Sequence, residues 1–561
     1  MVSDDVVARP TRSSRSTQAN PALPILPCTL MRGRQRIRDT GDPARRETPE
    51  AAAGPGAPLA LRYASPAGRW VLTAAVLGSG VAALDATVVG IALPSIGRAF
   101  SVGVEDLQWV VNAYTLTLAG LLLLGGTLGD RAGRRRVFII GVIWFALASV
   151  VCGVAPNSTV LILARALQGV GAALLTPGSL AILQASFAPD DRSRAIGAWS
   201  GLGGVASAVG PFIGGWLIAA VSWRLIFFIN LPLALVVVLI AARHVPESRA
   251  PTSSGHVDVP GAVTVTLGLA GLTYGLIEGP ARGWGSPPIV ASLAAGVFLL
   301  GAFLVVEHRS ASPMLPLHVF ASRQFSAANA VTFVVYAALG GTFFLLPVVL
   351  QLVAGYTPVA AGAALLPVTA IMLALSSSSG ALAARIGPRL QMSVGPLVIA
   401  AGLAMLARID DAGDYLTQVL PAVTVFGLGL AINVAPLTAT AIGAAPADNA
   451  GVASAVNNDV ARTAGLIAVA VLPAAAGISG QTYLDAEALQ AGFHTAVLIA
   501  AAACVGGGLL AFVSIRNPAR SRRAAAQPRL GVHCAVDATP LRSFPAPSAV
   551  ADGPATTTGA G

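Results

Sequence analysis

The chain has 561 residues, of which 55% are hydrophobic and only 11% are charged, and its mean hydropathy is +0.74. A soluble domain does not tolerate that much apolar surface, and a membrane β-barrel would show short alternating segments in place of long apolar runs. The formal net charge is +10, but the arginines lie mostly in the two ends and the short loops, so the charge does not indicate a nucleic-acid partner. The composition predicts an all-α polytopic membrane protein.

Every one of the 35 basic residues is arginine, and no lysine occurs. A P-loop requires a lysine, and a retinal or pyridoxal Schiff base requires an amine. The composition therefore excludes an ATP-driven pump of the P-loop type, a retinal protein and a pyridoxal enzyme. The cysteines (Cys28, Cys152, Cys504 and Cys534) have no metal-binding spacing, and the histidines form no H-E-x-x-H motif. We expect no cofactor, no metal and no enzymatic activity.

Both ends of the chain have a composition that is typical of disorder. Residues 1–69 are rich in Arg, Pro, Ala and Ser without helical periodicity, and residues 516–561 are similar. We interpret both as disordered cytoplasmic tails. No cleavable signal peptide is visible, so the first span is expected to act as its own insertion signal. Met31 precedes a basic run and is an alternative start to Met1.

Fourteen apolar runs are long enough to cross a bilayer. They lie at about 70–93, 108–128, 137–155, 159–183, 196–220, 225–243, 259–278, 289–306, 327–351, 360–379, 392–408, 416–436, 451–476 and 494–514. An even number places both termini on one side. With both termini cytoplasmic, twelve arginines fall in inner loops and four in outer loops or span edges, which agrees with the positive-inside rule. We predict a multi-pass plasma-membrane protein of this orientation.

A loop motif recurs at a constant offset of 254 residues. Gly126-Thr-Leu-Gly-Asp-Arg-Ala-Gly-Arg-Arg-Arg136 joins the second and third runs, and Gly380-Ala-Leu-Ala-Ala-Arg-Ile-Gly-Pro-Arg389 joins the tenth and eleventh. A repeat of this length is typical of two halves built on one plan. Six spans belong to each half if spans 7 and 8 are inserted between them. The predicted organisation is a six-helix bundle at 70–243, a linker with the two inserted spans at 244–325, and a second six-helix bundle at 326–515.

The first copy of this loop, called the arginine loop below, combines three small residues with charges. The glycines allow a tight turn and close helix approach. Asp130 is expected to pair with a guanidinium group at a neighbouring helix end. A purely topogenic basic loop remains the alternative. The candidate residues are Gly126, Gly129, Asp130, Arg131, Gly133, Arg134 and Arg135.

Three polar residues inside apolar spans are candidates for proton coupling. Asp85 lies in span 1, about 13 Å from Pro94 at helical rise, where a charged carboxylate costs about 2.5–3.5 kcal/mol. Arg165 and Gln168 share one face of span 4 at i, i+3 spacing. Arg165 needs a partner such as Asp85, or it lies near the outer end and extends to the surface. A simple hydrogen bond between helices is the alternative role of Asp85.

Further candidates lie in spans 5 and 13. Span 5 carries Gly201 and then Gly210, Pro211, Gly214 and Gly215, which allow a kinked, tightly packed seam; a mere packing interface is the alternative. In span 13, Asp459 and Arg462 at i, i+3 spacing are expected to form a structural ion pair. Glu278 is expected to be solvated at the outer edge of span 7. Polar side chains that could line a cavity are Asn112, Tyr114, Gln351, Asn433, Asn457, Asn458 and Arg462.

Taken together, these motifs resemble those of the major facilitator superfamily, and within it the fourteen-span drug–proton antiporter family. The resemblance covers about 70–515. It is carried by Leu84-Asp85-x-Thr87…Leu93-Pro94, the complete arginine loop, Arg165-Ala-Leu-Gln168-Gly169, Gly201 with Gly210-Pro211-x-x-Gly214-Gly215, and Trp223-Arg224…Asn230-x-Pro232. Gly90 departs from the family pattern, which usually has asparagine there, so one polar cavity contact is expected to be absent.

The resemblance implies alternating access between two bundles, with a ligand cavity at their interface. An entering proton would be exchanged for an outgoing drug, antibiotic or other amphiphilic molecule. The family links the span-4 motif to proton coupling and the span-5 motif to export, and its members commonly work as monomers. The expected partners are a small-molecule substrate, protons and the bilayer. The alternatives are an exporter of a single metabolite, a proton-coupled importer and a transporter-like sensor, although no output domain follows residue 515.

Overall fold

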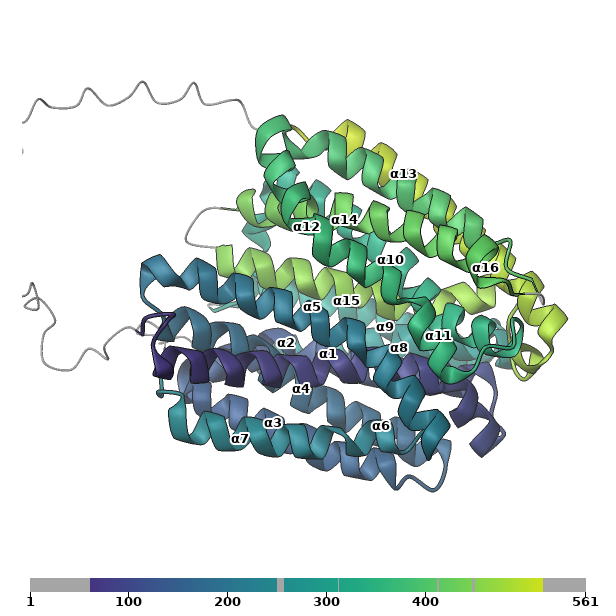
Figure 1. Cartoon of the computed structure of the whole chain (residues 1–561), viewed down its shortest axis with the longest axis horizontal. Coiled ribbons are helices and arrows are strands. Elements are labelled where there is room, and N and C mark those ends of the chain that lie inside the picture. The colour runs from purple at the N-terminus through teal and green to yellow at the C-terminus, as the bar shows by residue number, and fades with distance from the viewer. Residues whose placement is uncertain (1–60, 250–256, 311, 411–412, 446–449, 518–561) are drawn as a thin grey trace, which may run out of the picture. The chain divides into compact units, whose positions relative to one another are not determined.

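The computed structural model describes residues 61–249, 257–310, 312–410, 413–445 and 450–517. Helices account for almost all of this part of the chain (Figure 1). Their bounds are α1 Pro66–Phe100, α2 Val104–Ala132, α3 Arg134–Gly153, α4 Ser158–Ser186, α5 Pro189–Ala220, α6 Leu225–Phe228, α7 Asn230–His244, α8 Val259–Arg282, α9 Pro287–Arg309, η1 Leu317–Ala321, α10 Arg323–Leu352, α11 Pro358–Ala364, α12 Leu366–Ile386, α13 Pro388–Leu406, η2 Tyr415–Val419, α14 Leu420–Gly443, α15 Ala450–Ala475, η4 Thr482–Leu484 and α16 Ala486–Ser514.

Fourteen of the described helical segments are long and apolar enough to span a membrane, which confirms the predicted number. Three of these spans are interrupted. Span 6 consists of α6 and α7, span 10 consists of α11 and α12, and span 12 begins with the short π-helical turn η2. In the first two, a proline at 232 or 367 lies in the first turn of the second piece, where its missing N–H costs no helical hydrogen bond.

Helix α1 begins at Pro66, before the predicted start of its span. The Ser65 hydroxyl accepts a hydrogen bond from Gly68 N at 3.1 Å, as expected of an N-cap residue followed by proline. Leu61 is bridged to Phe187, where α4 ends. The assignment of residues 61–69 to a disordered tail is therefore wrong. The predicted tails at 1–60 and 518–561 lie outside the described residues.

Helices α1–α7 pack together as one half, and α10–α16 pack together as the other (Figure 1). The internal repeat recurs in this packing: α4 packs against α2 and α3, and α14 packs against α12 and α13. The arginine loop and its copy thus occupy equivalent places, before α3 and before α13.

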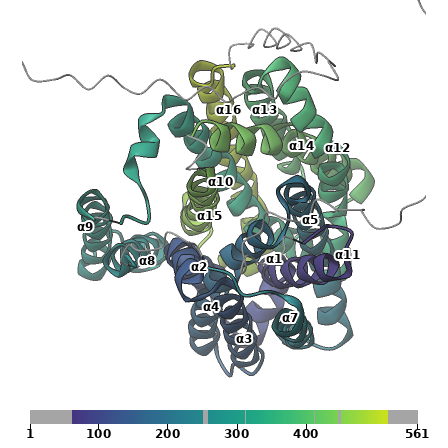
Figure 2. The same cartoon turned by 90° about the vertical axis from the view of Figure 1, so that its left-hand side faces the viewer.

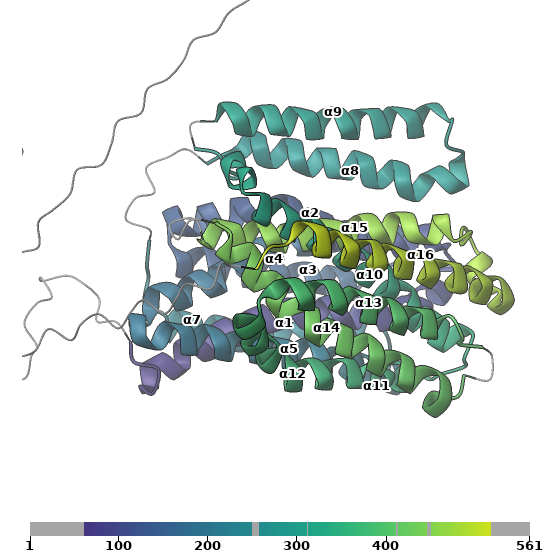
Figure 3. The ribbon, with the colours of Figure 1, turned by 90° about the horizontal axis from the view of Figure 1, so that it is seen from above.

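The inserted pair α8–α9 lies outside both halves (Figures 2 and 3). Helix α8 contacts α2 of the first half and α15 of the second, and α9 packs on the far side of α8. Leu116, Leu269 and Leu466 form a small apolar cluster where α2, α8 and α15 meet. Glu278 is not solvated as predicted, because it accepts hydrogen bonds from Trp109 Nε1 at 3.1 Å and from Arg282 Nε at 2.7 Å.

The two halves are hydrogen-bonded at one end only, the end opposite the arginine loop. There, Gln351 Nε2 donates to the Ile91 carbonyl at 3.0 Å, and Gln108 Nε2 donates to the Val469 carbonyl at 2.6 Å. Gly480 N donates to Glu105 at 2.7 Å in the same region. Between described residues, no hydrogen bond or ion pair joins the halves at the end that carries the arginine loop.

Candidate functional site

A closed polar network occupies the interior of the first half. The carboxylate of Asp85, on α1, accepts from Arg165 Nη1 at 2.5 Å and from Gln168 Nε2 at 2.9 Å. Arg165 Nη1 also donates to Gln168 Oε1 at 2.6 Å. The i, i+3 spacing on α4 was predicted to place both side chains on one face, and both reach the Asp85 carboxylate, which was one candidate partner for Arg165.

Two further residues complete the network, and the sequence analysis did not select them as site residues. Asn230 Nδ2, at the start of α7, donates to Asp85 Oδ1 at 3.0 Å and to Ser149 Oγ at 3.0 Å. Ser149, on α3, also accepts from Gln168 Nε2 at 2.7 Å. Ser149 was missed because one hydroxyl in an apolar run is common. Asn230 had a signal, because it lies in the Asn-x-Pro stretch that carried part of the resemblance.

Arg165 does not extend to the surface, since only 1% of it is exposed. Its Nε donates to the Val110 carbonyl at 3.1 Å, and its guanidinium carbon lies 4.3 Å from the centroid of the Tyr114 ring. The Phe227 ring lies on another side at 6.0 Å. The cation is therefore enclosed by a carboxylate, an amide, a carbonyl and aromatic faces, which together replace its hydration.

In this network the charges of Asp85 and Arg165 stabilise each other, because each is the other's buried counterion. Breaking a buried ion pair by removing one partner costs about 3–5 kcal/mol, because the other charge is left buried and unpaired. A proton arriving on Asp85 would likewise leave Arg165 without its counterion.

The arginine loop is held by charged contacts on both sides. Asp130 Oδ1 accepts from Arg134 Nε at 2.8 Å and Nη2 at 2.8 Å, so the pair spans the α2–α3 turn. Behind the turn, Glu247 accepts the backbone N–H groups of Arg135 at 3.1 Å and Arg136 at 3.2 Å. Glu247 thus satisfies free N–H groups at the N-terminus of α3, where a negative charge is stabilising.

The second copy of the loop has the same backbone but lacks these charges. Gly133 and Gly387 have φ values of 112° and 89°, and each precedes a helix. In the second copy, Asn517 accepts from Arg389 N at 3.0 Å in the position that Glu247 occupies in the first. Ala384 and Pro388 stand where the first copy has Asp130 and Arg134. The ion-paired turn is therefore specific to the first half.

Gly133→Ala is expected to destabilise the protein by about 1–3 kcal/mol, because φ of 112° is unfavourable for any L side chain. In addition, a Cβ there would lie 2.8 Å from the Glu247 carboxylate. Thermal unfolding in detergent measures the effect. The matched control is Gly201→Ala, a helical position with nothing within 4 Å of the added Cβ. Equal unfolding temperatures for the two variants would show that the turn carries no such constraint.

The remaining glycines of the arginine loop and the span-5 residues from Gly210 to Gly215 lie at helix contacts, whereas an added Cβ at Gly201 would meet no atom within 4 Å. Gly126 faces Pro177 of α4, where an added Cβ would lie 3.6 Å away, and Gly129 lies beside the turn. Gly210 and Gly214 pack against α1, at Thr87 and Val88. Gly215 packs against Pro358, and the Pro211 carbonyl packs against Gly362, so both contact α11 of the second half. Residues 210–215 of the span-5 motif therefore lie where the two halves meet at their closed end.

The predicted cavity residues fall into two groups. Asn112, Tyr114, Asn433 and Asn457 are buried between helices, whereas Asn458 is exposed and Arg462 half-buried. Asn112 Nδ2 donates to the Leu466 carbonyl at 3.2 Å, and Asn457 Nδ2 donates to Thr332 at 2.9 Å. Neither side-chain atom of Asn433 has a hydrogen-bond partner. Asn112 is therefore buried where the halves meet, whereas Asn457 contacts α10 and Asn433 contacts α13 within the second half.

The predicted Asp459–Arg462 ion pair is not among the ion pairs within 4.0 Å that join described residues. Instead, Asp459 Oδ1 and Arg462 Nε are buried without partners. Residues at i, i+3 on a helix are neighbours only if their rotamers converge.

Gly90 lies against α10, where an added Cβ would be 3.7 Å from the Phe343 carbonyl oxygen. Its small size permits this approach of the halves.

A family model described as Major Facilitator Superfamily matches residues 75–470, which include the whole network and both loop copies. The chain belongs to the major facilitator superfamily. It has that family's fold, with two six-helix bundles and two inserted helices. It is a multi-pass membrane transporter of small molecules and not an enzyme, as predicted.

Named relatives in this family are resistance and export proteins. The puromycin resistance protein pur8 of Streptomyces alboniger is 38% identical over 76% of this chain and 85% of its own length. The tetracenomycin C resistance and export protein of Streptomyces glaucescens is 36% identical over 72% of this chain and 74% of its own length. The multidrug resistance protein Stp of Mycobacterium tuberculosis has the same identity and coverage.

Solved transporter structures share the fold at low sequence identity. A bacterial homologue of the human lysosomal transporter Spinster superposes with a TM-score of 0.57 at 16% identity, over 81% of this chain and 100% of its own. The POT family transporter PepTSo gives 0.58 at 14% identity, over 80% of this chain and 97% of its own. At such identities the likeness concerns the fold alone.

Proposed function

We propose that this protein is a proton-driven efflux transporter of the plasma membrane. It exports drugs, antibiotics or related amphiphilic molecules in exchange for entering protons. The names of the relatives support export: one confers resistance to puromycin, another exports tetracenomycin C, and a third is a multidrug resistance protein. The protein works as a monomer with both termini in the cytoplasm.

The observation that carries the coupling proposal is the ion pair of Asp85 and Arg165 in the interior of the first half. Only 1% of each residue is exposed, and no other ion pair between described residues is buried to this extent. Ionisable groups inside a membrane span are costly and typically mark a proton or substrate pathway. Asp85 is the proton acceptor in this proposal, while Arg165 and Gln168 respond to its charge. Asn230 and Ser149 position the carboxylate.

The arrangement of the halves supports alternating access. Between described residues, the halves are hydrogen-bonded only at the end opposite the arginine loop, and that loop lies on the cytoplasmic side in the proposed orientation. In this orientation the hydrogen-bonded end faces the outside, so we assign this conformation to the outward-closed state of the alternating-access cycle. The Asp130–Arg134 ion pair restrains the α2–α3 turn. We expect this turn to control closure of the cytoplasmic side.

Inside-out vesicles that carry the protein, acidified in their lumen, test this proposal. A pH-sensitive dye reports proton release when amphiphilic dyes and antibiotics are added one at a time. Release by several unrelated compounds supports multidrug antiport. Release by a single compound supports a dedicated exporter, which the compound-specific names of some relatives also suggest. If no compound in a broad panel releases protons, proton-driven efflux is rejected.

A further inference from the structure

Two carboxyl groups meet where the inserted helices α8 and α9 come together at the end that carries the arginine loop. Asp258 is the N-cap of α8 and is 8% exposed, and Glu307 lies in the last turn of α9 and is 3% exposed. Asp258 Oδ1 accepts from Gly261 N at 2.8 Å. Glu307 Oε2 accepts from Leu315 N at 3.0 Å, in the segment that leads into the second half.

The second oxygen of each carboxyl lies close to the same residue, Gly261. Asp258 Oδ2 and Glu307 Oε1 are buried and have no conventional hydrogen-bond donor. Each lies 2.8 Å from the point that a Cβ on Gly261 would occupy, so the two oxygens converge over this glycine. Any larger residue at 261 would displace both.

No cation compensates the pair. Between described residues, no arginine or histidine nitrogen lies within 4.0 Å of either carboxyl group. On α9, the neighbouring His308 and Arg309 are exposed, and on η1, His318 is exposed. Helix α2 contributes Leu121, Leu123 and Leu124 to the apolar cluster around this corner. Two carboxylates in such a place repel one another, and sharing one proton relieves the repulsion.

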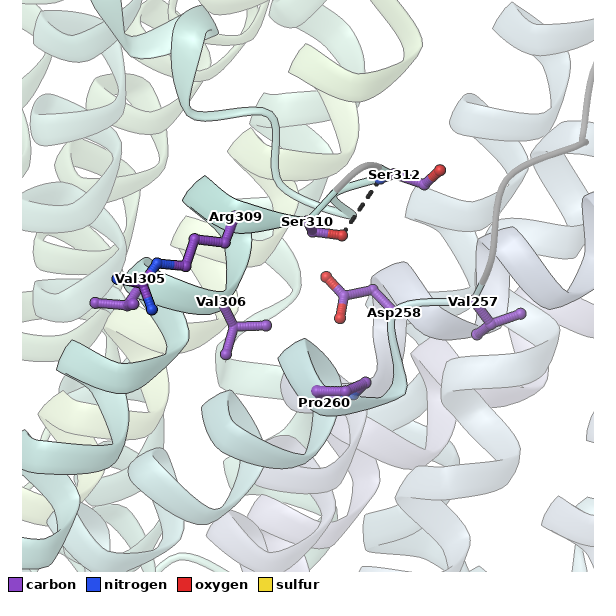
Figure 4. Close-up of a pocket in the computed structure, with 8 residues that line it drawn as sticks. All are labelled: Val257, Asp258, Pro260, Val305, Val306, Arg309, Ser310 and Ser312. Carbon is purple, nitrogen blue, oxygen red and sulfur yellow. Dashed lines mark hydrogen bonds between the residues drawn. The ribbon is translucent and has the colours of Figure 1, made fainter.

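The pair has a route to water. A pocket of about 440 Å³ opens beside Asp258 and is lined by Pro260, Val306, Ser310 and Ser312, with Arg309 at its rim (Figure 4). Asp258 presents its carboxylate to this space (Figure 4), and Glu307 is almost fully buried. The opening allows proton exchange without opening the bundle.

We propose that Asp258 and Glu307 bind a single proton between these two oxygens. This site is separate from the Asp85 network and does not depend on efflux. An O–H···O⁻ hydrogen bond between two carboxyl groups is short and strong. The shared proton therefore links the start of α8 to the end of α9. Glu307 also accepts a hydrogen bond from Leu315 N, so the linked carboxyl groups fix the position of the segment that leads into the second half. When the proton is lost, the two carboxylates repel each other. The junction of α8, α9 and the segment 312–317 then becomes less stable.

Infrared spectroscopy of the full-length protein in lipid nanodiscs tests the proposal, because it detects the carbonyl band of protonated carboxyl groups. At neutral pH, Glu307→Gln is expected to lose the band of one protonated carboxyl relative to the wild type. Asp258→Asn, which preserves the helix cap, is expected to lose one as well. The double variant is also expected to lose only one, since the pair holds one proton. Glu278→Gln, on the same hairpin but ion-paired with Arg282, is the control and should lose none.

Hydrogen exchange of the segment 312–317 provides the second measurement. In the wild type, protection of this segment should fall as the pH rises, after correction for the intrinsic exchange rate. In Glu307→Gln it should not change with pH. An unchanged band in Glu307→Gln, or a loss of two bands in the double variant, overturns the shared proton. A band that disappears when sodium is added at constant pH overturns it in favour of an alkali-cation site.

Discussion

Asp85→Asn is expected to leave the protein folded and to abolish proton release driven by substrate. Asparagine has nearly the same shape as aspartate and can still accept a hydrogen bond from Gln168, but it cannot take up a proton. Its neutral side chain also weakens the charge-assisted contact with Arg165, now 2.5 Å long. We therefore expect no substrate-driven proton release above background, and the weakened contact is expected to cost about 1.5–3 kcal/mol of stability.

The measurement compares dye-reported proton release with binding of the same compound to purified protein. We expect binding to persist while proton release is lost, because the carboxylate lies within the first half and not in the seam between the halves. Glu278→Gln is the matched control, since it removes another partly buried carboxylate that takes part in hydrogen bonds. Wild-type export by Asp85→Asn with unchanged proton release would exclude Asp85 from coupling.

Arg165→Leu is expected to lower the free energy of unfolding by about 3–5 kcal/mol. The substitution leaves Asp85 buried as an uncompensated carboxylate and removes the donors to the Val110 carbonyl and to Gln168. Leucine also cannot make the cation–π contact with Tyr114. Thermal unfolding in detergent, together with the yield of monodisperse protein, measures the loss.

A double variant separates the charge effect from the packing effect. If the cost comes from the unpaired carboxylate, Asp85→Leu in the Arg165→Leu background should restore part of the lost stability. A double variant that is as unstable as the sum of the two single variants would show that the two charges do not act as a pair. Arg224→Leu is a suitable comparison, because Arg224 donates to the Ala155 carbonyl at 3.0 Å but forms no ion pair with a described residue.

The sequence predicted those features that depend on local spacing. The length of the apolar runs predicted the fourteen spans. This works because a segment that crosses a bilayer must satisfy its own backbone hydrogen bonds, which a helix does. The i, i+3 spacing placed Arg165 and Gln168 on one face, and Asp85 was proposed as a partner for the arginine. The constant offset of the two loops predicted equivalent turns, and Gly133 and Gly387 do have similar backbone conformations.

Predictions that depended on a side chain's neighbours were less successful. Glu278 was expected in water but binds Trp109 of another helix. Asp459 and Arg462 were expected to pair but do not. Local spacing shows which side chains share a helix face, while rotamers and the approach of other helices decide which atoms meet.

The sequence by itself therefore determined the class of protein, the number of spans, the repeat and the central charges of the network. Only the tertiary structure decided that Asn230 and Ser149 complete the network and that Glu247 caps the arginine loop. It also decided that the carboxyl groups of Asp258 and Glu307 come together beside Gly261. The physical reason is that these groups come from separate helices, and a pairing between helices depends on their packing, which the spacing of residues along the chain does not encode.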